Sequence, residues 1–557
     1  MSLTEGKPPV AAVDPPGDRG GAMPTLPGGL FARKSTGLVR EVSGKQQIFW
    51  NFLSGFPPYG LALGVFFALS GFPGGNLVVA ALLAIPLALV IAYTYGLLTA
   101  AMPRTGGDYV YVSRILHPFG GLLSSCAFGL AGFTTIAYVC AAFSSLALAP
   151  ALSTIGLISG SSTLVNWGST LATSKDWQFG IGCVVIVVGC GMCLGGWRTV
   201  RRIVFGIMWL ALAGLGVTVL IAIFTSRSTF AAHFNAFGAS HGVHNAYQAT
   251  LAAARKNGVQ LGAGFSWAKT IPMVGVLATF GLYSWFSSFI GGEIRQGSST
   301  KVANRNGIGA LLVMGSIVLC VVLFFKTFGQ DFLTAVNAGG LSPKLGTTPA
   351  YFYLTSVQLN NTIVAIALSV AFIGVFPIIV PYQTLFITRY LFAWGFDGLL
   401  PKQWTRLNRL GAPDLAIAFT VVFALAVYAW SIYLAKNFVQ VLVYNTLFTF
   451  LSMGLVAIAA IVFPYRLPAL YKASSSRMRV LGVPLLVWTG ILSLLSLGFV
   501  TYLYFHFAFF GLSNKAGIIP WFAGITIVAA VLYLVPRAVR RREGIDLSLV
   551  FKEIPPE

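Results

Sequence analysis

The sequence predicts an all-α membrane protein that crosses the bilayer many times, and three observations support this fold class. Of the 557 residues, 56% are hydrophobic and only 9% are charged. A soluble protein of this size needs many more charged side chains to cover its surface. The chain also contains long uncharged apolar segments, and short segments rich in Lys and Arg separate them, as in polytopic membrane proteins.

Twelve apolar segments are long enough to cross a bilayer, for which roughly 20 residues suffice. They cover approximately residues 46–70, 76–101, 119–150, 179–195, 203–225, 270–292, 306–328, 356–393, 413–434, 438–463, 483–509 and 518–536. The chain therefore divides into a disordered N-terminal tail (1–38), a ten-helix core (39–463, with halves at about 46–225 and 270–463), two peripheral helices (464–536) and a C-terminal tail (537–557). The role of the external segment between the halves, 226–269, is left open.

The distribution of basic residues orients these segments. With the N-terminus in the cytoplasm, 27 of the 36 Lys and Arg residues fall on the cytoplasmic side and 9 fall outside. Cytoplasmic loops of membrane proteins carry such an excess. We therefore expect both tails to be cytoplasmic, in a multi-pass protein of the plasma membrane. The same rule explains the net charge of +22, so membrane lipid is an expected partner and nucleic acid is not.

The first apolar segment is interrupted in its middle by Gly55-Phe56-Pro57-Pro58-Tyr59-Gly60. Proline lacks an N–H group and clashes with the preceding helical turn, so two adjacent prolines break a helix. Inside a bilayer, a broken backbone is tolerated only where protein buries it or where it lines a polar cavity. Broken helices near the midplane form the substrate sites of many secondary transporters. A proline kink that serves packing alone is the alternative interpretation.

The sixth segment carries a similar interruption, rich in Gly, Ser and aromatic residues, at residues 281–285. Two such interruptions at corresponding positions indicate an inverted repeat. We therefore predict a substrate site formed by Gly55, Phe56, Pro57, Pro58, Tyr59, Gly60, Gly281, Leu282, Tyr283, Ser284 and Trp285. Tyr59 and Gly60 would donate backbone hydrogen bonds from the start of the outer half-helix, placed near Tyr59, and carbonyls near Gly281 and Tyr283 would accept them.

Three further stretches resemble the amino acid–polyamine–organocation permeases. Residues 101–114 (AMPRTGGDYVYVSR) resemble the loop after their second helix, and Gly292-Glu293-Ile294-Arg295 resembles the end of their sixth helix. Residues 389–401 (RYLFAWGFDGLLP), followed by Gly411-Ala412-Pro413, are similar to their loop between helices 8 and 9. The resemblance covers about residues 38–536. It implies the leucine-transporter-like fold, a 5+5 inverted repeat with broken helices 1 and 6 plus two peripheral helices, and secondary transport of amino acids or related amines.

The sequence departs from this family at its predicted site. Phe56-Pro57-Pro58 stands where relatives carry Gly-Ser/Ala-Gly, and Trp285 stands where they often carry glutamate. On the cytoplasmic side, we predict that Arg40, Glu41, Arg104, Arg389 and Asp397 form a gate. In that gate Arg389 and Asp397 would pair with each other or with Arg40 and Glu41, although orientation and folding alone could also account for each residue.

The charged residues constrain the substrate. All 14 acidic residues lie in tails, in loops or at segment ends. Because a dication would need a carboxylate in its site, we expect a small neutral, zwitterionic substrate. Another small polar solute, such as a polyamine or a nucleobase, is the alternative, followed by a sensor on the same fold. We expect no enzyme activity, cofactor or metal site, since no catalytic cluster or phosphate-binding loop occurs. The coupling ion, H⁺ or Na⁺, is left open.

Overall fold

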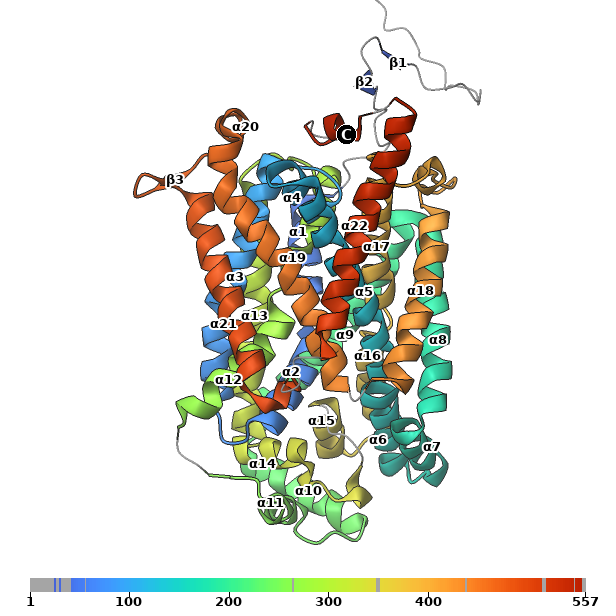
Figure 1. The fold of residues 1–557 in the computed structure, drawn as a ribbon. Helices are drawn as coiled ribbons and strands as arrows, with labels where there is room; N and C mark the ends of the chain where they lie inside the picture. The colour runs from blue at the N-terminus through green and yellow to red at the C-terminus, as the bar shows by residue number, and fades with distance from the viewer. Residues whose placement is uncertain are drawn as a thin grey trace, which may run out of the picture.

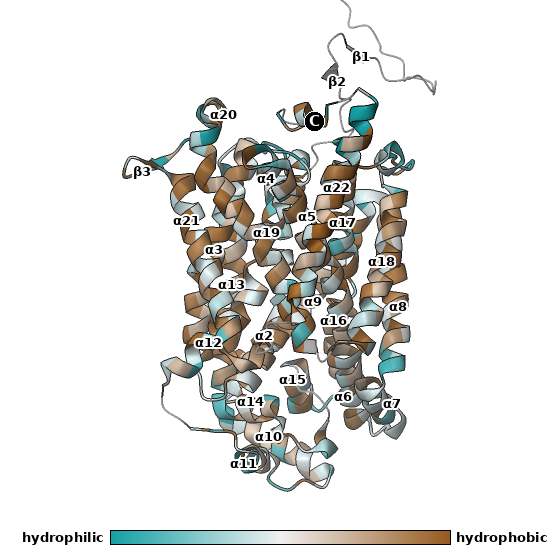
Figure 2. Ribbon diagram, viewed as in Figure 1, coloured by the Kyte–Doolittle hydropathy of each residue, from teal (hydrophilic) through white to brown (hydrophobic). Residues whose placement is uncertain are grey.

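The computed structural model describes residues 25–26, 30–31, 42–55, 57–262, 265–346, 351–435, 438–512, 517–544 and 546–552. Long helices run roughly parallel to one another through the middle of the molecule, while short helices gather at its two ends (Figure 1). The residues of these long helices are mostly hydrophobic along the middle parts of the helices (Figure 2). Within the described residues, ten helical segments are long and apolar enough to cross a membrane.

The helices of the N-terminal half are α1 (Gly44–Ser54), α2 (Pro57–Gly71), α3 (Leu77–Ala101), α4 (Gly107–Ile115), α5 (Pro118–Ala142), α6 (Ala149–Ser159), α7 (Ser162–Thr173), α8 (Lys175–Met192), α9 (Gly196–Phe224), α10 (Arg227–Ser240) and α11 (Ala246–Lys256). Two short pairs of antiparallel strands are also present. They are β1 (Thr25–Leu26) with β2 (Leu30–Phe31), inside the tail predicted to be disordered, and β3 (Arg479–Val480) with β4 (Val483–Pro484).

The C-terminal half contains α12 (Trp267–Gly281), the 3₁₀ turns η3 (Phe286–Phe289) and η4 (Gly291–Glu293), α13 (Lys301–Thr327), α14 (Gln330–Ala335), α15 (Tyr351–Leu359), α16 (Thr362–Ile373), α17 (Ile379–Phe396), α18 (Asp414–Tyr433), α19 (Phe438–Arg466), α20 (Pro468–Ala473), α21 (Leu485–His506), α22 (Ile519–Arg542) and α23 (Leu547–Val550). α4, α20 and α23 lie at one end of the molecule, and α10, α11 and α14 lie at the other (Figure 1).

The apolar segments predicted from the sequence appear as helices, with two differences in how they are divided. α8 and α9 form one apolar stretch of 50 residues, in which a short 3₁₀ turn at Cys193–Gly195 separates them. The segment expected at 356–393 begins in the last residues of α15 and continues as α16 and α17, which turns at 374–378, containing Pro377, separate. The count of twelve spans and the 5+5 inverted repeat stay predictions.

The segment 226–269, predicted to be external, is more ordered than its polar sequence suggests. Most of it forms α10 and α11. Phe230 and Phe234 of α10 are fully buried and pack on Phe332 of α14, with ring centroids 5.5 and 5.1 Å away. These aromatic contacts hold α10 against α14, the short helix that follows α13.

A buried network of amide side chains fixes the two interrupted spans to each other. Asn306 on α13 accepts a hydrogen bond from Asn51 on α1 (2.7 Å) and one from Ser287 on η3 (3.0 Å). Asn51 in turn accepts a hydrogen bond from the backbone N–H of Ser287 (2.9 Å). Because buried polar groups must be paired, this network fixes the position of both breaks.

Candidate functional site

The first span is broken at the predicted place. α1 ends at Ser54, and α2 begins at Pro57 rather than near Tyr59. This correction has a simple cause: proline suits the first turn of a helix, where its missing N–H would have no partner in any case. Gly60 faces the carbonyl oxygen of Gly55, which would lie only 2.8 Å from an added Cβ. Gly60 therefore permits the close approach of backbone across the break.

The sixth span is broken as well. α12 ends at Gly281, four residues in turns follow, and η3 begins at Phe286. The backbone N–H of Leu282 still donates to Ala278, whereas those of Trp285 and Phe286 both donate to Tyr283. The continuous i→i−4 pattern of an α-helix is thus lost between Leu282 and Phe286.

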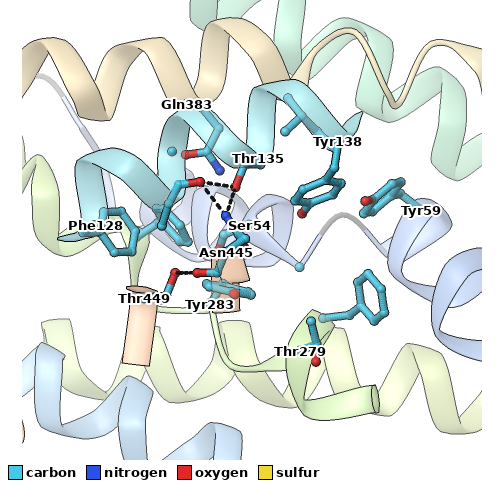
Figure 3. Close-up of a pocket in the computed structure, with 16 residues that line it drawn as sticks. Ser54, Tyr59, Phe128, Thr135, Tyr138, Thr279, Tyr283, Gln383, Asn445 and Thr449 are labelled. Carbon is cyan, nitrogen blue, oxygen red and sulfur yellow. Dashed lines mark hydrogen bonds between the residues drawn. The ribbon is translucent and has the colours of Figure 1, made fainter. Parts of the chain in front are cut away.

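A cavity lies between these two breaks and the helices α5, α17 and α19 (Figure 3). Its volume is about 40 Å³, which is room for a few water molecules, so the site is contracted in this conformation. It is lined by Ser54, Gly55, Tyr59, Phe128, Ala131, Gly132, Thr135, Tyr138, Thr279, Phe280, Tyr283, Phe286, Ile379, Gln383, Asn445 and Thr449. Among the described residues, no charged side chain lines it.

Several polar groups of this cavity come from α5, α17 and α19. The side-chain amide of Asn445 donates to the hydroxyl of Thr135 at 2.7 Å (Figure 3). Thr449 donates to the backbone carbonyl of Asn445 at 3.0 Å. The Oε1 atom of Gln383 is buried and has no hydrogen-bond partner in the described part of the chain. A buried acceptor without a partner is costly, so this oxygen is suited to accept a hydrogen bond from a ligand.

Charged residues gather instead at the end of the molecule that the charge distribution predicts to be cytoplasmic, where two buried ion pairs join distant parts of the chain. Arg114 on α4 pairs with Asp397 after α17 at 2.7 Å, and Arg389 on α17 pairs with Glu293 on η4 at 3.0 Å. Burial opposes the charged form of Arg114, but the neighbouring Asp397 carboxylate raises its pKa overall. We call these two pairs, with the backbone contacts around them, the cytoplasmic closure.

Backbone hydrogen bonds complete the cytoplasmic closure. Val42, just before α1, donates to the carbonyl of Glu293 and accepts from the N–H of Arg295, both at 2.9 Å. Gly106 donates to the carbonyl of Phe289 at 3.0 Å. Gly106 and Gly107 have φ values of +101° and +43°, which favour glycine. The glycine pair thus lets the loop after α3 turn against η3.

Comparison with known protein families identifies the family to which this chain belongs. The family model for amino acid permeases matches residues 48–532 of the chain. The chain belongs to the amino acid permease family. No curated protein matches it. The match covers both breaks, the cavity and most of the cytoplasmic closure, so the molecule is a multi-pass membrane transporter.

The permease brings three of the predicted substrate-site residues to the cavity, namely Gly55, Tyr59 and Tyr283. Phe56 lies outside the described residues. The other seven pack near the breaks without lining this cavity: Pro57, Pro58, Gly60, Gly281, Leu282, Ser284 and Trp285. Trp285, for example, is fully buried and stacks on Tyr95 with ring centroids 3.6 Å apart.

Sequence reasoning missed the contribution of α5, α17 and α19 to the cavity. Gln383 and Asn445 are amide side chains within otherwise apolar spans, which was an available signal because polar groups are costly in a bilayer. Thr135 and Thr449 gave no such signal. Their hydroxyls can bond to the carbonyl one turn earlier in their own helix, as both do here, so they occur in ordinary membrane helices.

The predicted pair of Arg389 with Asp397 is not formed, whereas the pairing of either residue with Arg40 and Glu41 stays a prediction. Arg389 and Asp397 do not pair with each other, because eight residues of helix separate them by roughly 12 Å. Glu293 and Arg114, which were not placed in the gate, are their partners. Arg104 lies in the loop after α3 and donates to the carbonyl of Pro103 at 3.2 Å. Arg40 and Glu41 lie outside the described residues.

Proposed function

We propose that the permease is a secondary active transporter that moves a small neutral, zwitterionic amino acid across the plasma membrane by alternating access, with both termini in the cytoplasm. The observation that carries the proposal is a polar cavity between two broken spans, with no charged side chain among the described residues that line it. A zwitterion has no net charge to neutralise, but its two ends need separate hydrogen-bonding partners. The amino acid permease match supports the same substrate class.

In this proposal the start of α2 receives the substrate carboxylate. The first amides of a helix have no intrahelical partners and carry a partial positive charge. Pro57 and Pro58 contribute no N–H, so the donors are the amides of Tyr59 and Gly60. The substrate ammonium donates to the free Oε1 of Gln383 and to backbone carbonyls near Gly281 and Tyr283.

In this proposal the transporter alternates between a conformation closed on the cytoplasmic side and a conformation closed on the outer side. Its core is a 5+5 inverted repeat, and the protein has twelve spans. The cytoplasmic closure is formed in the present conformation, and it must open for the substrate to leave. A polyamine is disfavoured because the described cavity lining offers no carboxylate to a dication. A sensor on this fold would bind the same ligands without moving them, so transport itself must be measured.

Uptake into proteoliposomes tests the proposal. The panel contains radiolabelled L-alanine, L-serine, L-leucine and L-phenylalanine, with putrescine and adenine as the alternative solutes. We expect saturable uptake of at least one neutral amino acid and none of putrescine.

Replacing Pro57 and Pro58 together by alanine should let the first span close into one helix and abolish uptake, and Gly60→Leu should fill the break. Normal transport by both variants, or uptake of putrescine or adenine alone, would contradict the proposal.

A further inference from the structure

Among the described residues, three carboxylates are buried near the end predicted to be cytoplasmic, and one of them differs from the other two. Asp397 and Glu293 each pair with an arginine. Asp108 on α4 is fully buried and pairs with no arginine or lysine in the described part of the chain. A buried carboxylate without a countercharge is costly, and it exchanges a proton more readily than a paired one.

In the part of the chain that the structure describes, all the groups that hold Asp108 are neutral. Its carboxylate accepts hydrogen bonds from the hydroxyls of Tyr390 on α17, Ser452 on α19 and Ser124 on α5, the last at 3.1 Å. The backbone N–H of Tyr109 is a further donor, at 3.0 Å. Three separate helices therefore meet at one carboxylate group.

The described residues place few titratable and charged groups around Asp108. They are Tyr95 on α3, Tyr109, Tyr111 and the Asp397-bound Arg114 on α4, Cys126 on α5 and Tyr390 on α17. α19 contributes Ser452, and η3 contains only Phe and Ser. Burial raises the pKa of Asp108 to about 6, although the four hydrogen bonds oppose this rise. Asp108 can thus be protonated at the pH on one side of a membrane that carries a proton gradient and deprotonated at the pH on the other side.

The three helices that hold Asp108 are the same three that contribute Gln383, Asn445 and Thr135 to the cavity. On α19, Ser452 follows the cavity residue Thr449 by three residues, a rise of about 4.5 Å. On α5, Ser124 precedes the cavity residue Phe128 by four residues, and on α17 Tyr390 follows Gln383 by seven. Residues at these spacings share one helix face.

We propose that Asp108 is the proton-binding group that couples transport to a proton gradient. The inference rests on the proposed function. A proton from the outer side binds one carboxylate oxygen of Asp108 while a substrate occupies the cavity. Movement of α5, α17 and α19 as the cytoplasmic closure opens then changes the hydroxyl donors around the carboxylate. The proton leaves to the cytoplasm together with the substrate, so one proton and one substrate move in the same direction.

The test compares wild type with Asp108→Asn in proteoliposomes that contain a pH-sensitive dye and have their membrane potential clamped. The probe is an equimolar mixture of L-alanine, L-serine, L-leucine and L-phenylalanine, added at about pH 5.5 outside and pH 7.5 inside, values on either side of the Asp108 transition. Wild type should acidify the vesicle interior when the mixture is added. Asp108→Asn, which keeps the shape of the neutral form, should lose this proton flux about tenfold or more while it still exchanges labelled for unlabelled substrate.

Asp176→Asn is the matched control, because Asp176 is an exposed carboxylate at the start of α8 that accepts from Tyr433. It should keep both activities. Proton flux in Asp108→Asn equal to that of wild type would overturn the inference, as would a wild type that transports amino acids without moving protons. That second result leaves the proposed function standing. Loss of amino acid exchange in wild type would overturn both.

A second variant keeps the inference testable if Asp108→Asn does not fold. Ser452→Ala removes one donor from the carboxylate and retains the acid. Since that hydrogen bond stabilises the charged form, its loss should move the midpoint of the pH profile of uptake upward by about one pH unit. Ser496→Ala, on the peripheral helix α21, should leave the midpoint unchanged. An unshifted midpoint in Ser452→Ala would contradict a role for Asp108 in proton binding.

Discussion

The central cavity and the cytoplasmic closure use polar groups in opposite ways. The cavity contains amides and hydroxyls, no charged side chain among the described residues, and an acceptor on Gln383 that has no partner. The cytoplasmic closure contains two arginine–carboxylate pairs, each buried. The first region leaves hydrogen-bonding capacity for a ligand, and the second satisfies its own charges.

This difference has a physical reason. An amide can accept from the ammonium end or donate to the carboxylate end of a zwitterion. Unlike a fixed charge, it leaves no net charge buried in the cavity when the substrate is absent. In the closure, the paired charges stabilise one arrangement of the surrounding helices. Other arrangements are higher in free energy, because separating a pair would leave each buried charge without its partner. The comparison predicts that the closure controls stability and that the cavity controls affinity.

The largest effect is expected from breaking the closure. Arg114→Met leaves Asp397 without its arginine and should destabilise the folded protein by about 3–5 kcal/mol, the usual loss when one partner of a buried pair is removed. The double variant Arg114→Met, Asp397→Leu should regain most of that stability. Thermal unfolding in detergent measures both. Equal losses in the single and double variants would contradict a role of the pair itself.

A smaller effect, on binding alone, is expected in the cavity. Gln383→Leu removes the acceptor proposed for the substrate ammonium and should weaken binding by about 1.5–3 kcal/mol, which is roughly 10- to 150-fold. Its thermal stability should stay close to that of wild type. The control Gln178→Leu changes an amide on α8 that does not line the cavity. Competition binding with a labelled substrate measures the affinity of each variant. Equal affinities of Gln383→Leu and Gln178→Leu would mean that the substrate ammonium binds elsewhere.

Backbone geometry at the edge of the closure should matter less. Gly107→Ala places a side chain at φ +43°, and its Cβ would lie 3.0 Å from the ring of Phe289. The left-handed conformation costs about 1–2 kcal/mol for a residue other than glycine. Thermal unfolding should reveal that loss. Gly129→Ala on α5, where an added Cβ meets nothing within 4 Å, should have no such effect.

The smallest effect is a dependence of stability on pH. Because the pKa of Asp108 is raised to about 6 in the folded protein from 3.8, the folded state favours the protonated form. Its stabilising contribution is complete below pH 3.8 and is lost as the pH rises through about 6. Between pH 7 and pH 5 the folded protein should therefore gain roughly 1 kcal/mol from this group. Melting curves of Asp108→Asn should lack that part of the slope, and those of Asp176→Asn should keep it.

The sequence by itself determined the apolar spans, the two breaks and the glycine turn. These features depend on local chemistry: apolar length, the missing N–H of Pro57 and Pro58, and the positive φ values of Gly106 and Gly107. It also indicated an uncharged site, since all carboxylates lie outside the middle of the spans. The permease family was also recognisable from the sequence, because each of its three motifs is one continuous stretch of residues.

Only the tertiary structure decided which side chains meet. Gln383 and Asn445 reach the same cavity from helices far apart in the sequence, and Arg389 finds Glu293 rather than Asp397. Likewise, Asp108 reads as a loop residue in the sequence, yet helices α5, α17 and α19 bury it. Such contacts depend on how helices pack, and hydrophobic periodicity does not specify the neighbours of a helix that is apolar on every face.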